Sequence, residues 1–177
     1  MTEQDAPKYE QGIRPERYLG NLDLDREITT AIYSQIIDLG HDAAEGMEED
    51  PSVKKILLHQ VLHSLLRIEA FTSGGFGSYE YEKVNPEGFK KIKDLSAEEL
   101  LKIHQENTQK LKEGFSRPDI RNKIFNLPSG SASGLEMLID TAGHEEYHSG
   151  ELKQIATFLK LERVGVLDKR WGPKLKK

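Results

Sequence analysis

Apolar residues recur three or four positions apart in four long segments of this chain, and that period restricts it to helical architectures. The segments cover residues 21–46, 52–72, 96–114 and 131–162. Outside them, no alternation of apolar and polar residues predicts a strand. Because an amphipathic helix must bury its apolar face against other elements, four such helices predict an all-α fold, a four-helix bundle.

Local signals refine two of these helices. Ser96 followed by Glu99 has the spacing of a capping box, which predicts that the third helix begins there. Gly143 and Gly150 lie inside the fourth helix, where each costs about 1 kcal/mol relative to alanine. We expect such glycines to permit close packing against a neighbouring helix.

The length of 177 residues predicts a single domain with a substantial core. Residues 1–20 are interrupted by prolines and glycines, which predicts an extended N-terminal arm. Residues 21–165 would form the bundle, and residues 166–177 a basic C-terminal tail.

Charge and composition exclude several functional classes. The formal net charge of −5 argues against a nucleic-acid partner. The chain has no cysteine, which excludes disulfides, thiolate nucleophiles and cysteine-ligated metal sites. The first residues are acidic and polar rather than typical of a signal peptide, and no apolar run is long enough to span a bilayer. These features predict a cytoplasmic protein with no membrane partner.

Two connections are long for a helical bundle. The segment 74–95 carries Phe76, Tyr79 and Tyr81, and its length suggests a loop that covers a site and forms a pocket wall. The alternative is that its aromatic residues simply pack on the end of the bundle. The segment 115–130, with two prolines, is expected to be irregular.

The fourth helix carries two histidines, His144 and His148, spaced four residues apart. Residues at i and i+4 lie on one helix face with Cβ atoms roughly 5–6 Å apart. Two imidazoles so placed can bind one metal ion, since metal–nitrogen bonds are about 2.0–2.1 Å long. We therefore predict that His144 and His148 are metal ligands, against the alternative of two solvated or hydrogen-bonded histidines.

A second pair with the same spacing, His59 and His63, lies in the second helix and could supply a third ligand. A helical wheel at about 100° per residue places His59 at the edge of the apolar stripe and His63 further towards the polar side. That polar side carries Gln60, Ser64 and Arg67. We therefore predict His59 as the ligand, with His63 as the alternative. His41 and His104 have no partner in the sequence and are expected at the surface.

The segment from His144 to His148 also matches His-Glu-x-x-His, the zincin motif, in which the glutamate is the general base. Glu145 is therefore the candidate catalytic residue. The longer metzincin motif fails, because the following glycine is Gly150 and no third histidine follows. The alternative for Glu145 and Glu146 is a solvated helix face, which we favour over catalysis.

These motifs together resemble the DinB/YfiT-like superfamily of metal-dependent helical-bundle enzymes. In the second helix, Ser-Val-x-x-apolar-apolar-x-His is matched by residues 52–59. In the fourth, His-x-x-x-His-x-Gly-x-apolar is matched by His144, His148, Gly150 and Leu152. Length and helical layout agree over nearly the whole chain.

The resemblance implies an up-up-down-down bundle with a three-histidine site for a divalent metal ion, nickel or zinc, in a homodimer. It further implies action on a small-molecule substrate, as a hydrolase or as a thiol-dependent S-transferase or isomerase. The low-molecular-weight thiol in such enzymes is bacillithiol, mycothiol or glutathione. The chain departs from the family at Glu151, where glutamine is common, which puts transfer of any one member's substrate in doubt.

Two other functional readings remain open. A non-enzymatic bundle that binds metal or a protein partner would have the ligands but no open coordination position. A bundle with purely structural histidines would bind no metal. Neutral imidazole suits zinc, nickel, copper and iron alike, so the metal is not fixed by the ligands. In the enzymatic reading, the ion would lower the pKa of a bound water or substrate thiol.

Overall fold

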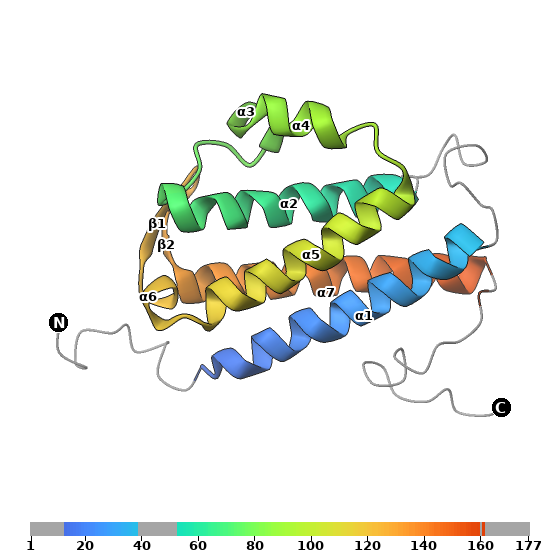
Figure 1. Ribbon diagram of the computed structural model, residues 1–177. Helices are drawn as coiled ribbons and strands as arrows, with labels where there is room; N and C mark the ends of the chain where they lie inside the picture. The colour runs from blue at the N-terminus through green and yellow to red at the C-terminus, as the bar shows by residue number, and fades with distance from the viewer. Residues whose placement is uncertain (1–12, 39–52, 160, 162–177) are drawn as a thin grey trace.

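The computed structural model describes residues 13–38, 53–159 and 161 (Figure 1). Within them the chain is mostly helical, which confirms the all-α class. Residues 1–12 of the N-terminal arm, residues 39–46 of the first helix, residues 162–165 of the bundle and the whole C-terminal tail, 166–177, lie outside this description, as does His41.

In the described part of the chain, four long helices form the body of the molecule, and three short helices and a two-stranded sheet connect them (Figure 1). The long helices are α1 (Pro15–Asp38), α2 (Val53–Ser73), α5 (Ala97–Ser116) and α7 (Gly134–Phe158). The short elements are α3 (Tyr81–Val84), α4 (Pro86–Ile92), α6 (Pro118–Arg121), β1 (Ile124–Leu127) and β2 (Gly130–Ser133).

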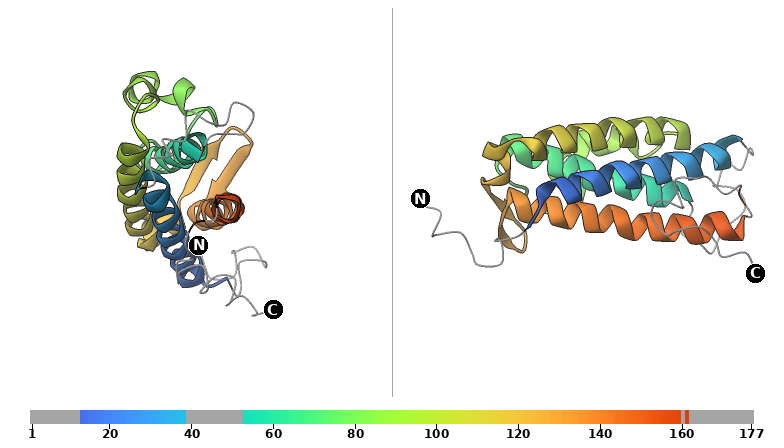
Figure 2. Two further views of the ribbon diagram at one scale, coloured as in Figure 1. Left: turned by 90° about the vertical axis from the view of Figure 1, so that its right-hand side faces the viewer. Right: turned by 90° about the horizontal axis from the view of Figure 1, so that it is seen from below.

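The first and last of the long helices run in one direction, and the two between them run in the other (Figures 1 and 2). Side-chain contacts fix this order. Arg26 and Thr30 of α1 contact Gln109 and Gln105 of α5, so these helices are antiparallel. Ser64 bonds Asn107 of α5, and Phe71 packs on Phe115 further along both helices, so α2 and α5 are parallel. The expected up-up-down-down order is wrong, and the chain runs up-down-down-up.

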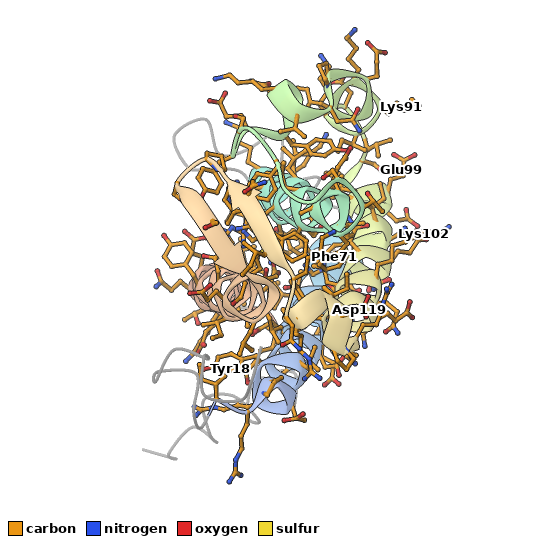
Figure 3. The ribbon with its side chains drawn as sticks, turned by 90° about the vertical axis from the view of Figure 1, so that its left-hand side faces the viewer. Tyr18, Phe71, Lys91, Glu99, Lys102 and Asp119 are labelled. Atoms are coloured by element: carbon orange, nitrogen blue, oxygen red, sulfur yellow. The ribbon has the colours of Figure 1, made fainter. Side chains whose placement is uncertain are left out.

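The core lies between these four helices and extends to the hairpin. Its fully buried side chains come from every long helix and from β1. They include Leu22, Ile28, Tyr33, Leu57, Leu66, Leu100, Leu111, Phe115, Phe125 and Met137. Viewed from the hairpin end, Phe71 lies among the helices, whereas Lys91, Lys102 and Asp119 project outwards (Figure 3). The apolar periodicity therefore predicted much of the core, except on α2, whose polar side is also buried.

Helix ends follow their local chemistry. The predicted capping box at Ser96 and Glu99 is confirmed, because the Ser96 side chain accepts from Glu99 N and the Glu99 carboxylate accepts from Ser96 N. Ser133 and Glu136 form a second capping box at the start of α7. Helix α1 begins at Pro15, a residue suited to a first helical turn. Residues 15–20, expected in an extended arm, are therefore helical.

The two long connections contain more structure than the sequence indicated. The segment 74–95 includes α3 and α4, which lie over α2 on the side away from α1 (Figures 1 and 2). The segment expected to be irregular contains α6 and an antiparallel hairpin in which Phe125 pairs with Ala132. Gly75 bridges to Asn126 beside this hairpin, and a Cβ on Gly75 would lie 2.0 Å from the Asn126 carbonyl oxygen.

The two glycines of α7 do not mediate close packing. A Cβ added at Gly143 or Gly150 would meet no atom within 4 Å. By contrast, a Cβ on Gly114 of α5 would lie 2.2 Å from the Phe71 ring. The close approach expected at α7 is therefore found between α2 and α5.

No helix in the described part of the chain is long and apolar enough to cross a membrane.

Candidate metal centre

Helices α2 and α7 meet along a polar seam rather than an apolar one. They run antiparallel, so residues four apart on α2 face residues four apart on α7 in reverse order. We call this set the α2–α7 seam. Its members are His59, His63 and Arg67 on α2, and Asp140, His144 and His148 on α7.

Three imidazoles of the seam converge on one point. The Nε2 atoms of His144 and His59 are 3.0 Å apart, and those of His148 and His144 are 3.3 Å apart. Two nitrogens bound to one ion at about 2.0–2.1 Å lie roughly 2.9–3.4 Å apart, from octahedral to tetrahedral angles. All three ligand atoms lie within 4.8 Å of one another. The structure thus brings together His59, His144 and His148, the three residues predicted as ligands, in a group that could hold a metal ion.

Carboxylates face the other nitrogen of both α7 histidines. His148 Nδ1 lies 2.6 Å from Glu151 Oε2, and His144 Nδ1 lies 3.4 Å from Glu145 Oε1, which is a long contact. A carboxylate that accepts from Nδ1 fixes the proton there and leaves the Nε2 lone pair free. Both rings therefore present Nε2 as an acceptor to the same point, an arrangement that a cation would stabilise.

Glu145 lies at the centre of a buried hydrogen-bond network. Its Oε2 accepts from Gln60 Nε2 at 2.8 Å and from His104 Nε2 at 3.1 Å, while Oε1 faces His144. The residue is only 4% exposed, so the favoured alternative of a solvated helix face is wrong for Glu145. Glu146 next to it is exposed, as that alternative expects. His104, expected at the surface, is 1% exposed.

Burial and neighbouring charges lower the pKa values of His59, His63 and His148, which favours the neutral imidazole near pH 7. Burial is the main cause that lowers the pKa of His59 and of His148. Burial also holds the pKa of His63 well below 6.5, and the Arg67 charge lowers it further. Burial alone would raise the pKa of Glu145, but the hydrogen bonds with His104 and His144 outweigh it and hold that pKa below its usual range. Neutral imidazole is the form that binds metal ions.

His63 lies one turn along the seam from the converging nitrogens. Its ring stacks on the His144 ring, with centroids 3.6 Å apart and planes 8° from parallel. With His144 and Glu145, but without His148, it forms a second group of donors that could hold a metal ion, so His63 in place of His59 in the three-histidine set stays a prediction.

The helical wheel predicted that the polar side of α2 faces solvent, and this prediction is wrong. Gln60, Ser64 and Arg67, which define its polar side, are all buried, whereas His59 is exposed. The polar side of α2 faces α5 and α7 because these helices supply side chains that pair with it. They include Asn107, Asp140 and Glu145.

The aromatic residues of segment 74–95 are placed differently from one another. Phe76 lines a cleft of about 530 Å³ together with residues such as Ser73 and Val84, and no histidine is part of that lining. Tyr79 is half-exposed, and its hydroxyl pairs with Ser129. Tyr81 is buried, and its hydroxyl accepts from Asn85. The segment therefore forms a cleft wall, but away from the three converging nitrogens.

Sequence reasoning missed several residues of this centre. Glu151 lies three residues after His148, and that helical spacing could have identified it as a partner. Gln60 and His104 gave no comparable signal, because each meets Glu145 only through packing between helices distant in sequence.

Comparisons with protein-family models, with curated proteins and with solved structures find no match to this chain. Function is therefore inferred from the geometry of the centre itself.

Proposed function

We propose that this protein is a metal-dependent enzyme of the DinB/YfiT-like type, which binds one divalent ion, nickel or zinc, through Nε2 of His59, His144 and His148. The observation that carries the proposal is the convergence of these three atoms at 3.0 and 3.3 Å. The presence of four long packed helices agrees with this type, although their up-down-down-up order differs from the order that the resemblance implied.

Three ligands favour a catalytic site over a structural one. Structural zinc sites are closed by four protein ligands, whereas catalytic sites keep a position for water or substrate. His59 is exposed and His144 is partly exposed, so an ion here is reachable from solvent. Such an ion supplies Lewis-acid chemistry, and three neutral imidazoles leave its full charge to attract an anionic ligand. The chain lacks cysteine, so any reacting thiol belongs to the substrate or to a low-molecular-weight thiol cofactor.

The two carboxylates behind the ligands act by positioning them. Glu145 is buried, and both of its oxygens face side chains of the protein, so its geometry favours orienting His144 over acting as a general base. Glu151 orients His148 in the same way. With these roles, the reaction we propose is thiol-dependent group transfer or hydrolysis of a small molecule, in a homodimer.

Cobalt substitution tests both the metal site and its open position. We expect Co²⁺ to bind the full chain with visible absorption, and a small thiol to add a sulfur-to-cobalt charge-transfer band. His63→Ala, which removes a stacking ring but no proposed ligand, is the matched control and should behave like the wild type. Cobalt binding with no response to thiols or other small ligands would favour the alternative, a non-enzymatic metal-binding bundle. No binding at all would contradict both.

A further inference from the structure

A buried arginine lies on the α2–α7 seam beyond the histidines. The Arg67 side chain is 4% exposed, and its Nη2 donates to Asp140 Oδ2 at 2.5 Å. Its guanidinium lies over the Phe76 ring, 5.1 Å from the centroid. Among the described residues, its Nε and Nη1 are buried without a hydrogen-bond partner. A buried charged donor left unpaired is costly, so this side chain retains binding capacity that the fold does not use.

The carboxylate that pairs with Arg67 is far more accessible than the arginine. The Asp140 side chain is 62% exposed, whereas the Arg67 side chain is buried. An exposed carboxylate loses little when it rotates into water. The same Oδ2 atom lies 4.0 Å from His63 Nε2, and His63 Nδ1 is itself buried without a partner among the described residues. An anionic oxygen at this point therefore faces Arg67 and His63 together.

This point lies one helical turn from the candidate metal centre. Successive members of the seam are four residues apart, which is about 6 Å along a helix axis. His63 connects the two, because its ring stacks on that of His144. Arg67 is eight residues from His59, about 12 Å along α2, so a small molecule bound at the converging nitrogens would reach Arg67 with a group several bonds away.

A purely structural role for Arg67 would be to tie α2 to α7 and to Phe76. One observation favours ligand binding instead: Nε and Nη1 of Arg67 are buried without a partner among the described residues. If the proposed divalent ion binds nearby, its charge and that of Arg67 repel each other, and an anion between them would offset the repulsion. Guanidinium presents its donors in a planar fork that matches carboxylate and phosphate groups.

We propose that Arg67 and His63 form an anion-binding subsite that holds a carboxylate or phosphate group of the substrate, and that Asp140 occupies this subsite until the substrate displaces it. The inference names the substrate class of the proposed enzyme and so rests on the proposed function. Binding of the anion itself does not require the metal.

Asp140→Asn tests the subsite because it removes the competing charge and keeps an amide oxygen that can accept from Arg67. Succinate and inorganic phosphate are titrated separately into the metal-free full chain at constant ionic strength, and the imidazole NMR signals of His63 are followed. We expect one or both anions to bind Asp140→Asn about tenfold more tightly than the wild type, since a competing carboxylate is gone. Whichever anion binds more tightly identifies the group that the substrate carries.

Asp119→Asn is the matched control, because Asp119 is also an exposed carboxylate paired with an arginine, Arg117. It should leave anion affinity at the wild-type value. Arg67→Lys, which keeps the charge but loses the fork, should weaken binding in the Asp140→Asn background. Equal affinities for wild type, Asp140→Asn and Asp119→Asn would overturn the subsite, even if the same protein binds metal. Enhanced anion binding in a protein that binds no metal would support the subsite and contradict only the proposed metal centre.

Discussion

The two histidines of α7 that we propose as ligands differ in how their neighbouring carboxylates contact them. Glu151 is three residues after His148, so both lie on one helix face and the contact is short, 2.6 Å. Glu145 is adjacent to His144 in sequence, and its contact with that ring is longer, 3.4 Å. Glu145 compensates through Gln60 and His104, which hold its other oxygen. Glu151, the residue at which this chain departs from the family it resembles, thus makes the shorter contact with a proposed ligand, His148.

Replacing Glu151 should weaken metal binding without unfolding the protein. In Glu151→Ala, the His148 ring loses the acceptor that fixes its tautomer, and we expect zinc affinity to fall about 10–100-fold. Glu151→Gln keeps an acceptor and should lose less. A competition titration against a chromophoric chelator measures both. Glu146→Gln, a change at an exposed glutamate of the same helix, serves as the control, and an unchanged affinity in Glu151→Ala would contradict the positioning role.

The lowered pKa of His63 predicts how stability depends on pH in the metal-free protein. The folded state disfavours the protonated imidazole, whereas the unfolded state takes up a proton near the ordinary pKa of 6.5. The unfolded state therefore binds more protons below that pH, so the free energy of unfolding should fall as pH drops from 7 towards 5. His63→Phe keeps a stacking ring and should reduce this slope. Urea unfolding at several pH values measures it, and an equal slope in both proteins would refute the assignment.

Helix α7 supplies two of the three candidate ligands, and it also contains two glycines that lower its stability. Gly143 and Gly150 are helical and have open space where a side chain would begin. The four-residue spacing of His144 and His148 places both rings on one face only if the helix is unbroken. Because neither glycine packs against a neighbour, their cost is the ordinary cost of glycine in a helix.

Alanine at these positions should therefore stabilise the protein. We expect Gly143→Ala and Gly150→Ala each to raise the free energy of unfolding by about 1 kcal/mol, with metal affinity unchanged. Chemical denaturation of the metal-free chain measures the change. Gly114→Ala is the opposing control and should destabilise, since its Cβ would lie 2.2 Å from the Phe71 ring. A loss of stability in the α7 variants would show that these glycines have a packing role.

Sequence patterns predicted the long elements better than the short ones. Helices α2, α5 and α7 follow from apolar periodicity over many turns, and Ser96 with Glu99 identified the start of α5. The hairpin has strands of only four residues, and β2, with the sequence Gly-Ser-Ala-Ser, has no apolar alternation to reveal it. Its position depends instead on pairing with β1 and on the close approach of Gly75 to Asn126.

In the whole molecule, the histidines of the candidate metal centre meet because α2 and α7 run antiparallel and contact each other through polar side chains. The four-residue spacing within each histidine pair predicted which histidines could meet, since two such pairs can converge when they lie on facing helices. It did not predict helix direction, the burial of Gln60 and Arg67, or the contribution of His104 from α5. Those features depend on long-range packing that local periodicity does not encode.

If His59, His144 and His148 bind one metal ion, the metal content of the protein should depend on each of these histidines. Elemental mass spectrometry is applied to untagged wild type, His59→Ala, His63→Ala and His148→Ala, each reconstituted with zinc or nickel and freed of excess. We expect near-stoichiometric metal in the wild type and in His63→Ala, and loss of metal in His59→Ala and His148→Ala. Metal lost with His63→Ala but kept in His59→Ala, or a wild type that binds none, would contradict it.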